Sequence, residues 1–441
     1  MRTSWLLGGV FLCACSSSSG SSTPPPIHID AGMKDTGVKA HDAGASHDAT
    51  HDATHDAPRD AAGDVGYPAP HAAMPQVVNS GGPVMTSPKF VIITFAGDAL
   101  APNIDDFADK VAASSTYWHG TTAEYGVGPV ASVLHISVNE APPPTLADSD
   151  VQTWITGKLS GPEAGVLDGG APWPQPDTNT LYMVYYPDNV SITMGGGSSC
   201  DAFYGYHGDY LLTGTTYVTY SVVARCPPFP MTTAIDSVTA IASHELVEAA
   251  TDPLAIDHPA YLQPDTADIA WAVPAGGEVG DLCAGYGNVF YQPTDVPYLL
   301  QRTWSNQAAA AGHDPCQPEG AVPYFNASVV FTDNVVVENF NAKGVKIPVG
   351  GTGTVEVELY SDGPTSGPWT IQASDLSGLM GGAEELEATF GGQSTATGVN
   401  GDKLTLTIKV LQQGSGGYEV LWLQSTLGQT MPVWLGAVGT P

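Results

Sequence analysis

His244, Glu245 and Glu248 have the residue types and the spacing of a metal-dependent hydrolytic site. On a helix with about 3.6 residues per turn, positions four apart point in nearly the same direction, so His244 and Glu248 share one face. An imidazole and a carboxylate placed in this way can supply two ligands of a tetrahedral zinc ion. Glu245 occupies the position at which the HExxH motif of zinc proteases carries its general base. Since Glu248 replaces the second histidine, the motif here is HExxE.

The third ligand of such a site must come from another part of the chain. A catalytic zinc ion usually has three protein ligands and one position open to water. The segment 277–283 is the best source, because Glu278 and Asp281 supply carboxylates and Cys283 can fix the loop through a disulfide. Asp252 and His258 are weaker candidates.

Calcium is an alternative occupant, because it prefers the hard oxygen ligands that Glu278 and Asp281 offer. The imidazole of His244 favours zinc instead. The ligand set therefore predicts a zinc site rather than a structural calcium site.

The helix that carries the motif is expected to begin at Thr232 or Thr233 and to end near Asp252, since Pro253 disfavours a helical conformation in the residue before it. Apolar residues recur at three- to four-residue spacing and predict one buried stripe. This stripe comprises Ile235, Val238, Ala242, Leu246 and Ala249. His244 lies nearly opposite it, so we expect the site on a separate, polar face.

Around this helix, the pattern of apolar and turn residues predicts an α+β domain over residues 76–318, with a mixed sheet. The expected elements are strands at 89–95, 131–138, 181–186 and 216–224, a helix from Asn103 to about Ala113, and a helix capped by Asp148 or Asp150. Residues 323–441 consist of short alternating segments separated by Gly, Asp and Pro, which predicts an all-β Ig-like sandwich. Such a sandwich could bind a polymer or serve as a spacer.

Six cysteines occur in the chain, and the four beyond the N-terminal region allow three pairings. We expect Cys200–Cys226 and Cys283–Cys316, because each pair closes a local loop. A cysteine metal site is the alternative, but no CxxC pair is present. The first of these loops contains His207. A histidine in such a loop more often has a structural role than a functional one.

The N-terminus predicts export. Residues 1–15 combine Arg2 with a short apolar run and end in Leu-Cys-Ala-Cys, which resembles a bacterial lipobox with lipid attached to Cys15. An ordinary secretory signal is the alternative. Both predict an extracytoplasmic protein in which disulfides can form. The lipobox further predicts a membrane-anchored lipoprotein of the outer membrane or cell surface.

Residues 16–75 have the composition of a disordered linker. His-Asp-Ala units recur at 41, 47, 51 and 55, with too little apolar content to form a core. We interpret the segment as a solvated tether, with a metal-scavenging tract as the alternative. The chain carries 45 acidic and 13 basic residues, a formal charge of −32. This balance argues against nucleic acid as a partner, because phosphate binding requires basic patches.

Three segments resemble the EXORDIUM (phosphate-induced protein) family and its bacterial zincin-like HExxE relatives. They read HELVEAATDPL from His244, EVGDLCAGYGNVF from Glu278 and QRTWSNQ from Gln301, and a late Cys316 follows. The resemblance covers about residues 80–317 and is most specific over 240–306. It implies a secreted, surface-associated protein with a zincin-like domain, and it carries over to His244, Glu245, Glu248, Glu278 and Asp281.

Two functions follow from these residues. The first is a zinc-dependent hydrolase, a metalloprotease in which His244, Glu248 and either Glu278 or Asp281 hold zinc while Glu245 moves the proton of a water molecule. The second is a non-catalytic binding or adhesion protein on the same scaffold. Its partners would be the membrane, through the lipid anchor, and a peptide or a cell-surface polymer.

Overall fold

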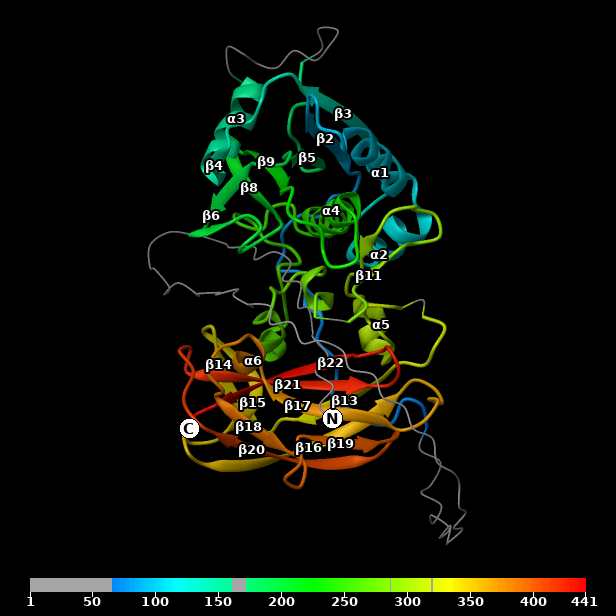
Figure 1. Cartoon of the computed structure of the whole chain (residues 1–441), viewed down its shortest axis with the longest axis vertical. Helices are drawn as coiled ribbons and strands as arrows, with labels where there is room; N and C mark the ends of the chain where they lie inside the picture. Colours follow the sequence, from blue (N-terminus) through cyan, green and yellow to red (C-terminus); the bar gives the residue numbers. More distant parts are fainter. Residues whose placement is uncertain (1–65, 161–171, 286, 319) are drawn as a thin grey trace, which may run out of the picture.

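The computed structural model describes residues 66–160, 172–285, 287–318 and 320–441. Cys15, the predicted signal peptide and the linker up to residue 65 lie outside the described residues. The chain is a mixed α+β protein in which strands predominate, with two halves stacked along the long axis (Figure 1). Among the described residues, no helix has the length and apolar character needed to span a bilayer.

A five-stranded sheet forms the frame of the first half, in the order β3-β2-β5-β9-β8. The strands are β2 (Lys89–Phe95), β3 (Ser132–Val138), β5 (Thr180–Tyr185), β8 (Gly205–Thr213) and β9 (Thr216–Val223). All pairs are parallel except β8 with β9. Along β2, Phe90 and Ile92 join the core on one face, and Val91 and Ile93 join the core on the other. The sheet is therefore buried on both faces, as parallel sheets normally are.

Three helices cover this sheet. α1 (Ala101–Ala113) and α4 (Ala234–Thr251) pack on one face, and α3 (Asp148–Ser160) packs on the other. α4 begins as predicted, with a capping box between Thr233 and Asp236.

The polar residues of α4 from Ser237 to Thr251 do not reach solvent, because every residue in this range is buried. The helix contacts β8 and β9 of the sheet and also β12 (Leu300–Gln301), so no side of its central turns reaches solvent. In Figure 1, α4 is surrounded by other segments of the chain.

Short elements complete the first half. They are β1 (Val77–Val78), η1 (Ser115–His119), α2 (Gly120–Thr122), η2 (Ala123–Tyr125), β4 (Thr145–Ala147), β6 (Ser191–Met194), β7 (Gly197–Ser198), β10 (Gln263–Pro264), η3 (Thr266–Ala272), η4 (Asp281–Cys283), β11 (Phe290–Tyr291) and α5 (Asn306–Ala311). Both expected disulfides, Cys200–Cys226 and Cys283–Cys316, are present. They fit an oxidising, extracytoplasmic compartment.

The second half consists of two sheets. One has the order β13-β16-β20-β18 and the other β14-β15-β22-β21-β17-β19. Their strands are β13 (Phe325–Val330), β14 (Asp333–Val337), β15 (Phe340–Lys346), β16 (Thr352–Ser361), β17 (Trp369–Asp375), β18 (Leu386–Thr389), β19 (Thr395–Gly398), β20 (Lys403–Val410), β21 (Tyr418–Thr426) and β22 (Val433–Gly439), with one helical turn, α6 (Leu376–Leu379). The sheets share a core through contacts of β13 with β21 and β22.

Residues 66–75, which we expected in the linker, lie against the second half. The side-chain oxygen of Asn400 accepts a hydrogen bond from the backbone N–H of Ala69 at 3.0 Å. The ring of His71 stacks on Tyr360 with centroids 3.7 Å apart. These contacts place residues 66–75 with the folded part of the chain.

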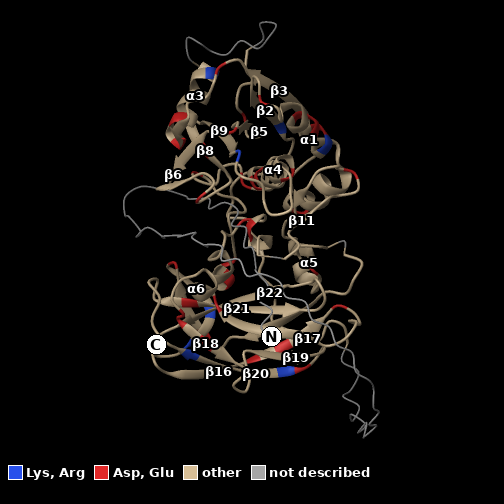
Figure 2. Cartoon of the chain, in the orientation of Figure 1, with Lys and Arg blue, Asp and Glu red and all other residues tan. Residues whose placement is uncertain are grey.

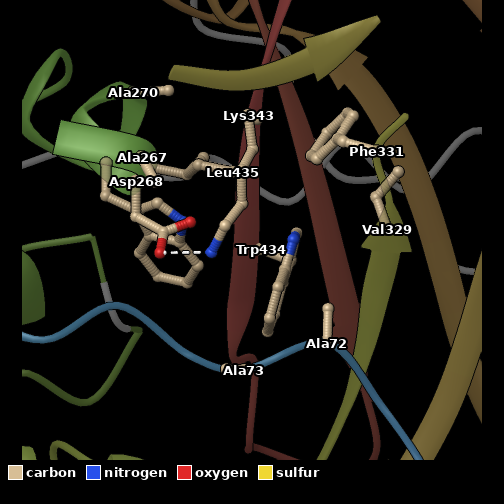
Figure 3. A pocket seen from close by; sticks show the side chains of 12 residues that line it. Ala72, Ala73, Ala267, Asp268, Ala270, Val329, Phe331, Lys343, Trp434 and Leu435 are labelled. Atoms are coloured by element: carbon tan, nitrogen blue, oxygen red, sulfur yellow. Dashed lines mark hydrogen bonds and ion pairs between the residues drawn. The ribbon is translucent and has the colours of Figure 1, made fainter. Parts of the chain in front are cut away.

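The two halves meet at a junction of tryptophans and one ion pair, beside a small pocket (Figure 3). Trp271 of η3 lies edge-on to Trp434 of β22, with centroids 5.5 Å apart. Lys343 of β15 donates to Asp268 of η3 at 2.8 Å. Burial raises the pKa of Asp268 to about 6, although the Lys343 ammonium opposes the change. The junction therefore ties the first half to the six-stranded sheet through η3.

Truncation of the junction tryptophan should destabilise the chain. Trp434 is 3% exposed, so Trp434→Ala removes a large buried ring and leaves a cavity, and we expect a loss of about 3–5 kcal/mol in the free energy of unfolding. Denaturant unfolding monitored by circular dichroism measures this loss. Val336→Ala, at a side chain 59% exposed, is the control and should change stability by less than about 0.5 kcal/mol. Equal midpoints for the two variants would contradict the role of Trp434.

Candidate metal centre

The central turns of α4 carry three residues of a buried polar cluster. His244, Glu245 and Glu248 are each 0% exposed. The Nε2 atom of His244 lies 3.0 Å from Oε2 of Glu248, which is the contact that a spacing of four residues predicts. Figure 2 shows acidic residues on α4, at the centre of the first half.

The disulfide-linked segment that includes η4 adds two carboxylates, and each contacts a different histidine. Oδ1 of Asp281 lies 3.7 Å from Nε2 of His244. Oε1 of Glu278 lies 3.5 Å from Nε2 of His207 instead. His244, Glu248 and Asp281 thus form a group whose candidate ligand atoms all lie within 4.8 Å of one another. Of the two expected sources of the third ligand, Asp281 joins His244 and Glu278 does not.

His207 belongs to the cluster, although the sequence favoured a structural place for it. Its Nδ1 atom lies 3.7 Å from Oε2 of Glu245 and 3.7 Å from Oε2 of Glu248. These three residues form a second group with ligand atoms within 4.8 Å of one another. β8 reaches α4 closely because Gly205 has no side chain: a Cβ there would come within 2.9 Å of Oε1 of Glu245. A glycine two residues before His207 is the one sequence signal of this approach.

Gln301 holds the other side of the His244 ring. Its Nε2 atom lies 2.8 Å from Nδ1 of His244 and donates to the carbonyl oxygen of Gly280 at 2.8 Å. Its Oε1 atom is buried and accepts no hydrogen bond. Because the amide lies against Nδ1 of His244 and is held by the carbonyl oxygen of Gly280, it fixes the position of the His244 ring. A partner of this kind typically orients a histidine ligand toward a metal.

The carboxylates of α4 have few hydrogen bonds for their depth. Both oxygens of Glu245, Oε1 of Glu248 and Oδ1 of Asp281 are buried without a hydrogen bond, and Oε2 of Glu248 has only its 3.0 Å contact with Nε2 of His244. Buried carboxylates are normally hydrogen-bonded, since desolvated charge is costly. A cation bound between them would satisfy these oxygens, so the residues present fit a metal ion.

The electrostatics of the cluster lead to the same conclusion. Burial raises the pKa of Glu245, and burial raises that of Asp281 well above its usual range. Burial alone would lower the pKa of His244, but the carboxylates of Glu248, Glu245 and Asp281 raise it to about 10. Burial therefore favours the protonated form of these carboxyls, and a metal ion would compete with those protons.

Asp252 and His258, the two weaker ligand candidates, belong to neither group of candidate ligands. The backbone N–H of Asp252 donates to the carbonyl oxygen of Glu248 at 2.7 Å, and its Oδ1 atom accepts from the N–H of Ala260 at 2.7 Å. Asp252 thus terminates α4 and holds the following loop. His258 is exposed and lies edge-on to Tyr217.

No protein-family model and no curated protein matches the chain. Several solved structures each resemble 27% of it, among them the following three. Domains 4 and 5 of the S-layer protein SbsC match at 11% identity over 53% of that chain, with a TM-score of 0.18. A FixG-related protein from Vibrio parahaemolyticus matches at 6% identity over 98% of that chain, with a TM-score of 0.19. A family 123 glycoside hydrolase from Clostridium perfringens matches at 10% identity over 27% of that chain, with a TM-score of 0.18. The chain spans about half the length of the first structure, and TM-scores this low assign neither fold nor activity.

A methyl group at Gly280 should disturb the centre. A Cβ there would lie 2.6 Å from Nδ1 of His244 and 2.6 Å from Oε1 of Glu248. The backbone of Gly280 is right-handed helical (φ −77°, ψ −40°), so Gly280→Ala introduces a clash without backbone strain. We expect a loss of about 1–3 kcal/mol in denaturant unfolding.

Gly157→Ala is the matched control. Gly157 lies within α3, and a Cβ there has no atom within 4 Å, so the substitution should stabilise the chain by up to about 1 kcal/mol. If both variants gained stability, the close packing of Gly280 against His244 and Glu248 would be refuted.

Proposed function

We propose that the chain is an extracytoplasmic zinc protein whose centre hydrolyses peptides, in the manner of a metalloprotease. The observation that carries the proposal is the fully buried group His244, Glu248 and Asp281, in which carboxylate oxygens without hydrogen bonds face an imidazole nitrogen. Glu245, the residue at the general-base position of the motif, lies in the same cluster.

The ligand types and distances support zinc. One imidazole with two carboxylates is a donor set that zinc accepts, whereas calcium takes oxygen ligands in larger number. Two donors at about 2.0–2.2 Å from a tetrahedral ion lie about 3.3–3.6 Å apart. The His244 nitrogen lies 3.0 Å from Glu248 and 3.7 Å from Asp281, distances on either side of that spacing.

In this proposal the metal, Glu245 and Gln301 have separate roles. Zinc would supply Lewis acidity toward a carbonyl oxygen and make water more acidic. Glu245 takes the proton of the attacking water and passes it to the leaving amine, a role that its raised pKa suits. Gln301 holds the ring of His244 from the opposite side.

A second candidate function is a non-catalytic, surface-associated binding or adhesion protein in which the metal only joins α4 to the η4 segment. The enclosure of the cluster favours it: Glu278 is 1% exposed, Asp281 3% and His207 5%, so a substrate would reach the centre only after local opening. In both cases we propose a zincin-like first half and an Ig-like second half, as the EXORDIUM resemblance and the strand pattern imply. The anchor would be a lipid on Cys15, at the outer membrane or cell surface.

Metal content tests the centre. The purified chain is expected to hold zinc at near-stoichiometric levels, measured by inductively coupled plasma mass spectrometry. His244→Ala should lose this zinc, because it removes the nitrogen ligand of the first group. His313→Ala changes a histidine side chain that is 54% exposed and should retain it. A wild-type chain without zinc would refute the proposal.

Peptide hydrolysis distinguishes the two candidate functions. Glu245→Gln is expected to abolish cleavage of a mixed peptide library while keeping the zinc of the first group, because the amide cannot accept the proton. Mass spectrometry of the products measures cleavage. Absence of cleavage by a zinc-loaded wild type would favour the adhesion protein, and equal cleavage by both forms would remove Glu245 from the reaction.

A further inference from the structure

We propose that the same cluster binds a second divalent cation, held by His207, Glu245 and Glu248, next to the zinc of the first group. Glu248 would be shared between the two positions. The inference rests on the proposed zinc centre and deepens it by adding a site that regulates Glu245. Three observations carry it: the distances, the balance of charge and the orphaned carboxylate.

The distances place a second set of ligands beside the first. Nδ1 of His207 is 3.7 Å from the nearest oxygen of both Glu245 and Glu248, close to the spacing of about 3.3–3.6 Å for donors on one tetrahedral ion. Oε2 of Glu248 is at the same time 3.0 Å from Nε2 of His244. Both histidines therefore contact the same oxygen of Glu248, and one carboxylate can bridge two ions, an arrangement found in hydrolytic sites with metals about 3.5–4 Å apart.

The balance of charge favours a second divalent ion over a single one. Four carboxylates, those of Glu245, Glu248, Glu278 and Asp281, face two imidazoles, and none of these carboxylates is more than 3% exposed. One divalent cation leaves two negative charges in a buried space, whereas two divalent cations with neutral imidazoles balance all four. Uncompensated buried charge is among the most costly features in a protein interior.

Glu245 is the residue that a single ion at the first group leaves unsatisfied. It is not part of that group, is 0% exposed and accepts no hydrogen bond at either oxygen. An ion at the second position would satisfy it. The same ion would also occupy the carboxylate that serves as the base in the one-ion state, so metal concentration would control hydrolysis.

The experiment measures how many ions the chain binds. Metal-free full-length protein is titrated with Co²⁺ by equilibrium dialysis, and the visible absorption of bound cobalt reports its ligands. Wild type is expected to bind one ion more than His207→Ala, and His119→Ala, at an exposed histidine, should match wild type. All variants carry the same N-terminal His-Asp-Ala repeats, so any cobalt that these repeats bind cancels in the difference.

The outcomes separate this inference from the proposed function. If wild type and His207→Ala bind equal numbers of ions while His244→Ala binds fewer, the second site is overturned and the zinc centre remains. No difference among wild type, His244→Ala and His207→Ala would overturn both. If His207→Ala does not fold, Glu245→Gln replaces it: a tenfold or greater weakening of one ion supports the site, and two ions at unchanged affinity refute it.

Discussion

Negative charge buried inside the first half is the constraint on which the rest of the structure depends. Four carboxylates converge from α4 and from the segment 278–281, and each is at most 3% exposed. Such a cluster persists only if protons, imidazoles or metal ions compensate it. The chain surrounds it with rigid parts: a central helix with a capping box, an edge strand and a disulfide-linked loop.

Local pattern predicted a large part of this arrangement. The strand at 89–95 has the expected bounds, and α4 begins and ends where its capping residues and Pro253 place it. The contact of His244 with Glu248 follows from helical geometry alone. These features depend on residues close in sequence, whose preferences are visible without knowledge of the tertiary structure.

Features that depend on long-range packing were not visible in the sequence. The periodicity of α4 predicted one polar face, but the helix is enclosed on all sides by β8, β9 and β12. His207 appeared as a single histidine because its partners come from a helix that follows about forty residues later. Gln301 carried no signal, since an amide becomes significant only when a histidine ring lies beside it. The choice between Glu278 and Asp281 likewise required the fold of the loop.

The bond between Cys283 and Cys316 has a consequence for the order in which the protein matures. Asp281 and Gly280, which pack against His244, lie just before Cys283 in a segment that the bond fastens to the end of the first half. If the proposed centre binds an ion before this bond forms, the bond would enclose it, and the ion would then leave only through local opening of the loop. Metal supply during export, rather than metal in the final surroundings of the protein, would then determine which ion the centre carries.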